Sequence, residues 1–293
     1  MIGAPLGLAG LAGLAGVVAL APLLGPGGPD PSVAMGARAL VVERAAAADE
    51  ALLALERAIE PALDLARSGT ARVVSGEAPA GEPLAYAGAM LVEVDPALAE
   101  AAARIRALEG ARRALGGSAR RIEPPGGVGE LASIGAQLEG TAPAAERFAS
   151  MRLRAERVLD GLAALVEALG QGDLAAAAAS LSEARDHHAA IAAWEVDLVT
   201  LPVWVEASGA LVDAAETLVS ATLAGDATAA AEAADVFAAQ REGAASADRA
   251  LRIAIGEGGS AVTAAPLGRL ADLLRRTAEA RVAVAEILHE ASR

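Results

Sequence analysis

The chain has 293 residues and a formal net charge of −14; 81 of its residues are Ala, whereas only 2% are aromatic. Ala is the strongest helix former because it loses no side-chain entropy, so this composition predicts long helices rather than sheets. The acidic balance argues against nucleic acid as a partner, because phosphates would repel it. The lack of cysteine excludes disulfides, thiolate metal sites and cysteine nucleophiles.

All 24 basic residues are Arg. The dense basic group consists of Arg112, Arg113, Arg120 and Arg121. We interpret Arg112 and Arg113 as charges that offset the negative end of a helix. The alternative is a contact with phospholipid headgroups or with an acidic partner.

The N-terminal segment, residues 1–24, is hydrophobic and predicts a transmembrane helix. Residues 1–29 carry no charged side chain, and Leu6 to Leu24 is a 19-residue run of Leu, Ala, Gly, Val and one Pro. As a helix this run would be roughly 28 Å long, close to the hydrocarbon thickness of a bilayer. The Gly- and Pro-rich residues 25–31 that follow predict a hinge.

Three interpretations of this segment are open, and we favour an uncleaved membrane anchor. The second is a signal peptide cleaved after Ala19-Leu20-Ala21, although Pro22 should hinder that cleavage. The third is a hydrophobic tail packed on the folded part. The segment lacks the basic residues that usually precede an anchor or a signal peptide.

Residues 32–122 are predicted to form a helical hairpin with an irregular insert at 70–94. Ser68-Gly69 should end the first helix. Asp95-Pro96 should begin the second, because a capping side chain is followed by a proline that has no amide to leave unpaired. Apolar residues of the first helix recur at alternating spacings of four and three, which is the seam of a helix packed on other helices. This seam comprises Val41, Ala45, Ala48, Leu52, Leu55, Ile59, Ala62 and Ala66.

Two points within this hairpin are ambiguous. Pro61 falls inside the first seam and should kink the helix or restart it, because proline lacks an amide hydrogen and its ring crowds the preceding turn. The stretch from Leu84 to Val94 could be either a short helix or an irregular loop.

Residues 130–292 are predicted to form an antiparallel up-down bundle of about four or five helices. Two similar turns, Gly172-Asp173 and Gly225-Asp226, belong to a weak internal repeat with an offset of 53 residues, which indicates two stacked helical hairpins. Each Asp should cap the next helix by accepting hydrogen bonds from amides two or three residues on. Gly256 should end the helix that begins near residue 227, and a last helix should begin at Leu267.

The three histidines are candidates for metal or ligand binding. Glu286 and His289 have the spacing of a metal-binding pair, but the helical periodicity places both on the side that faces water, so we expect no metal there. His187 and His188 flank an apolar seam, with Glu183 one turn before His187. We interpret them as boundary residues; the alternative is a pH-responsive or ligand-binding pair.

The two tryptophans, Trp194 and Trp204, bracket Pro202, where the sequence predicts a corner between helices. Large aromatic side chains commonly fill the space at such a corner, and this is the interpretation that we favour. The alternative is that they line a pocket or an exposed recognition surface.

The sequence therefore predicts an all-α fold, an antiparallel up-down bundle with coiled-coil-like seams behind a transmembrane helix. No phosphate-binding glycine loop or activated serine is evident, so we expect neither an enzyme nor a cofactor. We expect a scaffold or partner-binding module in the cell membrane, with the bundle outside the cytoplasm, or else secreted. Its partner would be another protein or a second copy of the chain. The alternative is a small-ligand sensor with a pocket near Trp194, Trp204 and His188.

Overall fold

The computed structural model describes residues 31–115 and 121–292, and within these ranges it is almost entirely helical, with no strand. The predicted all-α fold is therefore confirmed. The described helices are α1 (Pro31–Ser75), α2 (Gly81–Ala114), α3 (Glu130–Gln171), α4 (Leu174–Ala192), α5 (Thr200–Leu223) and α6 (Ala227–Ala291).

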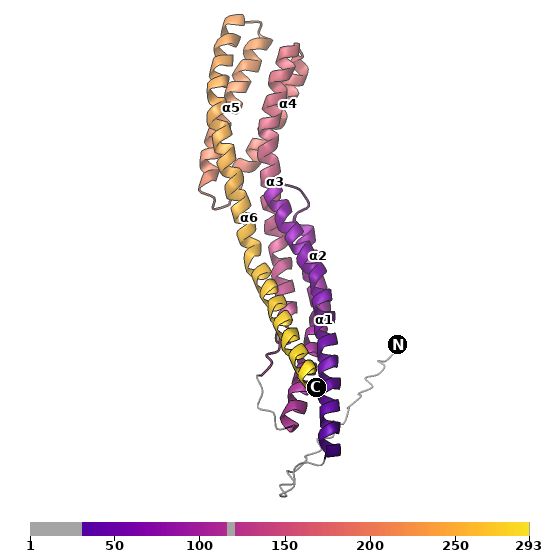
Figure 1. Ribbon diagram of the computed structural model, residues 1–293. Helices are drawn as coiled ribbons and strands as arrows, with labels where there is room; N and C mark the ends of the chain where they lie inside the picture. The colour runs from indigo at the N-terminus through magenta and orange to yellow at the C-terminus, as the bar shows by residue number, and fades with distance from the viewer. Residues whose placement is uncertain (1–30, 116–120, 293) are drawn as a thin grey trace, which may run out of the picture.

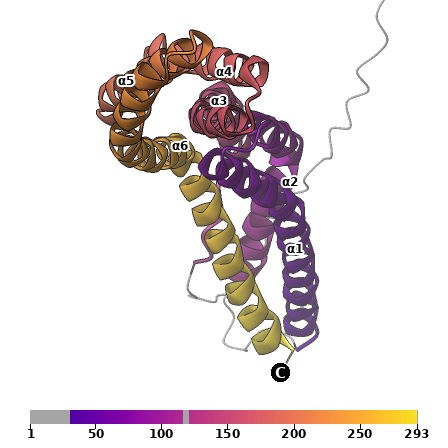
Figure 2. The same cartoon turned by 90° about the horizontal axis from the view of Figure 1, so that it is seen from above.

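The molecule is elongated because α3 and α6 run along most of its length (Figure 1). The other helices pack beside one half or the other of these two. The lower bundle consists of α1, α2, the first half of α3 and the last half of α6. The upper bundle consists of α4, α5 and the remaining halves of α3 and α6. Seen from above, α3 lies beside α4, and α5 lies beside α6 (Figure 2).

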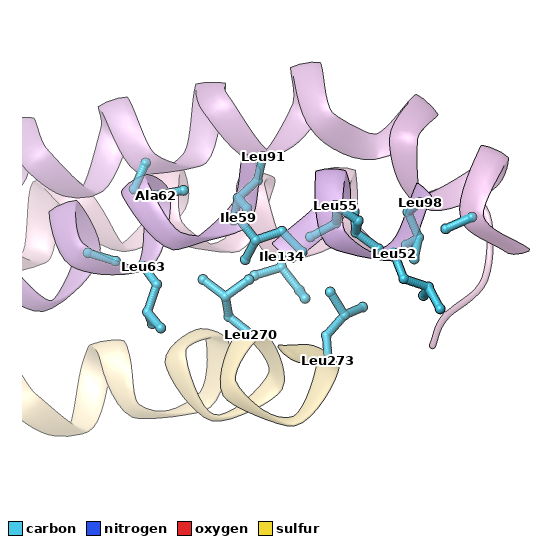
Figure 3. Packing of buried hydrophobic residues seen from close by; sticks show 14 of the residues in the cluster. Leu52, Leu55, Ile59, Ala62, Leu63, Leu91, Leu98, Ile134, Leu270 and Leu273 are labelled. Carbon is cyan, nitrogen blue, oxygen red and sulfur yellow. The ribbon is translucent and has the colours of Figure 1, made fainter. Parts of the chain in front are cut away.

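The core of the lower bundle is built from aliphatic side chains. Leu270 and Leu273 of α6 point toward α1 and toward Ile134 of α3 (Figure 3). Every residue of the seam predicted for the first helix is buried, so the spacing of apolar residues identified the inward face of α1 correctly.

The upper bundle has a core of its own, which includes Trp204 and Phe237. Met151, Ala155 and Val158 of α3 are buried in this core. Phe148 of α3 packs against both cores. It therefore marks the level at which the two bundles meet, which we call the junction.

The connection between α1 and α2 is shorter than the sequence predicted. α1 continues through Ser68-Gly69 to Ser75, and α2 begins at Gly81, so most of the insert predicted at 70–94 is helix. Gly69 serves packing rather than termination, because a Cβ at this position would fall 2.8 Å from Leu84 Cγ. α1 also continues through Pro61, so the helix does not restart there.

Asp95-Pro96 does not begin a helix, because both residues lie inside α2. The side chain of Asp95 caps a different helix. Its Oδ2 accepts a hydrogen bond from the Gly129 amide at 3.0 Å, and its Oδ1 accepts one from the Leu131 amide at 3.1 Å. The first amides of a helix have no partner within it, so Asp95 holds the start of α3 against the middle of α2.

The predicted helix end at Gly256 is wrong, because α6 continues to Ala291 without interruption. The glycines that follow Gly256 allow close contacts at the junction. Gly259 lies directly against Val73 of α1, and a Cβ on Gly258 would fall 3.0 Å from the ring of Phe148. A larger residue at either position would push the neighbouring helices apart, and this explains glycine in the interior of a long helix.

Among residues 31–115 and 121–292, no helix is long and apolar enough to cross a membrane. The transmembrane segment predicted at 1–24 lies outside the described residues, as does the predicted hinge up to residue 30. α1 begins and α6 ends at the same end of the lower bundle (Figure 1).

Candidate functional site

The two predicted Gly-Asp turns lie at the outer end of the upper bundle (Figure 1). Asp173 Oδ1 accepts a hydrogen bond from the Ala176 amide at 3.0 Å, and Asp226 Oδ1 accepts one from the Ala229 amide at 3.0 Å. The glycine before each Asp has a left-handed φ, 74° in the first turn and 72° in the second. Both predicted helix caps are confirmed, and both carboxylates therefore have a structural role at the start of a helix.

The histidine pair on α4 contacts other side chains of the upper bundle. His187 Nε2 lies 3.6 Å from Glu183 Oε1 on the same helix. The His188 ring stacks on Trp204, with ring centroids 5.7 Å apart, and its Nε2 lies 3.0 Å from the carbonyl oxygen of Val205. A carbonyl only accepts hydrogen bonds, so this contact places a proton on Nε2 and ties α4 to α5.

Trp204 itself is fully buried and belongs to a polar network. Its indole Nε1 donates to Asp248 Oδ1 at 3.3 Å, and Asp248 is 3% exposed. Arg252 donates from Nε to Asp248 Oδ2 at 2.6 Å and from Nη1 to Glu156 Oε1 at 2.8 Å. Burial raises the pKa of the Asp248 carboxyl above its ordinary value, although the charge and hydrogen bond of Arg252 oppose this shift.

Trp194 takes a different position, at the junction. Its ring meets Phe148 edge-on, with centroids 6.5 Å apart. Beside it lies a cavity of about 460 Å³ between α3 and the end of α4, which we call the junction cavity. Its lining consists of Pro143, Glu146, Arg147, Ser150, Met151, Arg154, Ala190, Ile191 and Trp194.

The junction cavity combines an apolar wall with two unpaired positive charges. Arg147 and Arg154 make no hydrogen bond or ion pair with another described residue. The third charged group, Glu146, is already engaged, because its Oε2 accepts hydrogen bonds from the Ala80 amide at 2.6 Å and the Gly81 amide at 2.9 Å. Those amides begin α2, where the helix dipole offsets the negative charge of Glu146. The cavity therefore presents net positive charge.

The predicted site residues do not converge on one pocket. Trp204 and His188 stack together inside the upper bundle, whereas Trp194 lines the junction cavity. Sequence reasoning did not select Arg147 and Arg154. Their spacing of seven residues, which puts them on one face of α3 two turns apart, was the available signal.

Glu286 and His289 are both exposed on α6, as the helical periodicity predicted. Within the described ranges, no three His, Asp or Glu side chains lie close enough together to hold a metal ion.

A comparison of the chain with protein-family models, with curated proteins and with solved structures finds no match in any of the three.

Proposed function

We propose that this protein is a small-ligand-binding helical bundle, and that the junction cavity beside Trp194 takes an amphipathic organic anion. The observation that carries the proposal is an indole wall beside two guanidinium groups that pair with no described residue, in a cavity of about 460 Å³. Pockets for small molecules are commonly of this size, mostly apolar, and supplied with a few polar groups that fix orientation.

The side chains around the cavity suggest how such a ligand would lie. Trp194 and Ile191 offer an apolar surface on which an aromatic or aliphatic body can pack. Arg147 and Arg154 are roughly 10 Å apart along α3, so either can bind a carboxylate or phosphate at one end of that body. The hydroxyl of Ser150 lies between them in sequence and on the same wall.

We also propose that residues 1–24 anchor the protein in a membrane, and the arrangement of the two bundles is compatible with such an anchor. The anchor would join the start of α1, at the end of the lower bundle that lies away from the upper bundle, so the upper bundle would be held at a distance from the membrane (Figure 1). From Gly258 at the junction, α6 runs roughly 50 Å to its C-terminal end, so the junction lies about that far from the end of the molecule that carries the start of α1. We therefore expect the full chain to fractionate with membranes and a chain without residues 1–29 to be released, folded, into the soluble fraction. Full-length protein in the cytoplasm would contradict the proposed location.

Binding can be tested with aryl anions of defined chemistry. Benzoate, phenylacetate and phenyl phosphate should bind in calorimetric titrations, whereas benzyl alcohol, which lacks the charge, should bind at least about tenfold more weakly. The same ligands should change tryptophan fluorescence. This change should disappear in Trp194→Phe, because the remaining Trp204 is fully buried.

Variants locate the site. Arg154→Gln and Arg147→Gln should each weaken binding of the anions and leave binding of the alcohol unchanged. Arg67→Gln is a matched control, because Arg67 is an exposed arginine on α1 away from the cavity. Failure of all three anions to bind, or equal affinity in wild type and both cavity variants, would overturn the proposed function.

A further inference from the structure

A second cavity lies on the opposite face of α3 from Trp194. It is a groove of about 580 Å³ between the end of α1, α3 and the middle of α6. Val74 lines it from α1, Arg152 from α3, and Arg249, Arg252 and Ile253 from α6. We call it the arginine groove. At 100° per residue, Arg152 lies roughly 150° around α3 from the face that carries Arg147 and Arg154, so the two cavities are separate.

Among the described residues, Arg152 has only a weak partner. Its Nε is buried and makes no hydrogen bond, and its ion pair with Glu156 Oε1 is 3.5 Å long. That same carboxylate oxygen accepts the 2.8 Å hydrogen bond from Arg252. One carboxylate is therefore shared between two guanidinium groups, and the charge of Arg152 is only partly offset.

The position of the Arg152 side chain requires a glycine at residue 76. This side chain lies across Gly76, where a Cβ would fall 2.8 Å from Arg152 Cδ. Gly76 also has a left-handed φ of 78°, which an L side chain rarely adopts. The turn between α1 and α2 therefore makes room for this arginine, and a guanidinium that is already positioned loses less entropy when it binds an anion.

Arg249 supplies the second available charge. It is exposed on α6 and makes no ion pair or hydrogen bond with another described residue. Arg252, one turn further on, is held by Asp248 and Glu156 and is not available. Glu257 also lines the groove and sets a limit on its ligands, because a dianion would place a second negative charge near this carboxylate.

Apart from Ser260, the rest of the groove is apolar. Val74 is 43% exposed and Ile253 is 62% exposed, so both offer surface that no described side chain covers. Between them Gly256 carries no side chain, and the nearest atom to a Cβ there would be Val74 Cγ1 at 3.9 Å. This leaves an open apolar strip beside the two arginines.

We propose that the arginine groove is a second ligand site, which binds a small monocarboxylate with an aliphatic chain. The carboxylate is held by Arg152 and Arg249, and the chain covers Val74 and Ile253. Because Val74 is in the lower bundle and Arg249 is in the upper one, the ligand connects the two bundles across the junction.

The probe is hexanoate, titrated calorimetrically into the full-length protein. Hexanol and hexylammonium, which have the same number of carbon atoms, are the neutral and cationic comparison probes. Hexanoate should bind, and the neutral and cationic probes should bind at least about tenfold more weakly. Arg249→Gln should remove this event with the helical circular dichroism unchanged, since Arg249 is exposed. Ile253→Ala should weaken the binding of hexanoate and should not strengthen the binding of hexanol or hexylammonium.

Arg154→Gln separates this site from the junction cavity. If hexanoate binding is retained in Arg154→Gln and lost in Arg249→Gln, the arginine groove is the site, whatever happens with the aryl anions. Retention in Arg249→Gln with loss in Arg154→Gln would overturn this inference and support the junction cavity instead. The inference is also overturned if hexanoate does not bind, or if both variants or neither variant abolish its binding.

Discussion

Gly88 of α2 and Gly135 of α3 touch backbone to backbone. A Cβ on Gly88 would fall 2.6 Å from the carbonyl oxygen of Gly135, and a Cβ on Gly135 would fall 2.5 Å from that of Gly88. The obstructing atoms belong to the backbone and cannot rotate away, so the separation of α2 and α3 requires glycine at both positions.

Gly135→Ala should therefore destabilise the protein by about 1–3 kcal/mol, as overpacking of a close helix contact does. The measurement is the free energy of unfolding in urea. Gly140→Ala on the same helix is the matched control, because a Cβ at Gly140 meets nothing within 4 Å. Alanine forms helix better than glycine, so the control should be more stable by about 0.5–1 kcal/mol. Equal effects in the two variants would contradict the close contact.

The inward faces of the helices could be predicted from the sequence, but several helix ends could not. The apolar spacing that marks α1 depends only on which side of a helix is buried, and it is visible within one segment. Gly69 and Gly256 look locally like helix ends. They lie in helix interiors because other parts of the chain approach there: Leu84 at Gly69 and, beyond Gly256, Val73 and Phe148 at its neighbouring glycines. Such contacts join residues far apart in sequence, so no local pattern contains them.

The residues of the candidate sites, too, could be predicted from the sequence only in part. Trp194 stood out in the sequence because tryptophan is rare in this chain, and the junction cavity lies beside it. Arg147 and Arg154 are two of 24 arginines. What distinguishes them is their position in the lining of the junction cavity beside Trp194, which depends on the packing of α3 against α4. Trp204 could not be separated from Trp194 by sequence, although it is buried in the upper core.

The cap that Asp95 provides for α3 should be worth a measurable part of the stability. Asp95→Ala leaves the amides of Gly129, Leu131 and Ala132 without their acceptor, so we expect a loss of about 0.5–2 kcal/mol. Asp95→Asn keeps an oxygen acceptor and should lose less. Asp235→Ala, at an exposed aspartate without a hydrogen bond among the described residues, is the control and should change little. A loss in Asp95→Ala no larger than in this control would argue against a cap across helices.

The two caps at the outer end of the upper bundle should behave alike. Asp173→Ala and Asp226→Ala should each cost about 0.5–2 kcal/mol, because each removes the acceptor of the first helical amides and a negative charge at a helix start. Thermal melting of both single variants measures this loss. Similar decreases are expected because the two turns share their geometry. Unchanged or higher melting temperatures would instead assign these carboxylates to a binding role that is held at some cost to stability.

Asp248 should make stability depend on pH. Its pKa is raised in the folded protein, chiefly by burial, so the folded state binds the proton more tightly than the unfolded state, whose carboxyl has a pKa near the ordinary value of 3.8. Stability from this group is therefore fully present below that value and is lost as pH rises through the higher, folded pKa.

The wild type carries 38 acidic residues, so the contribution of Asp248 has to be measured as a difference. The free energy of unfolding of the wild type minus that of Asp248→Asn should fall as pH rises from about 3.5 to about 7. Asparagine is the suitable replacement because its amide oxygen can still accept the hydrogen bond from Trp204 Nε1 while the titrating group is gone. In a Trp194→Phe background Trp204 is the sole tryptophan, and its emission should shift over the same pH interval with Asp248 present and not with Asp248→Asn, since its indole contacts that carboxyl directly. A difference that is flat or rises with pH would mean that Arg252 outweighs burial and keeps Asp248 ionised.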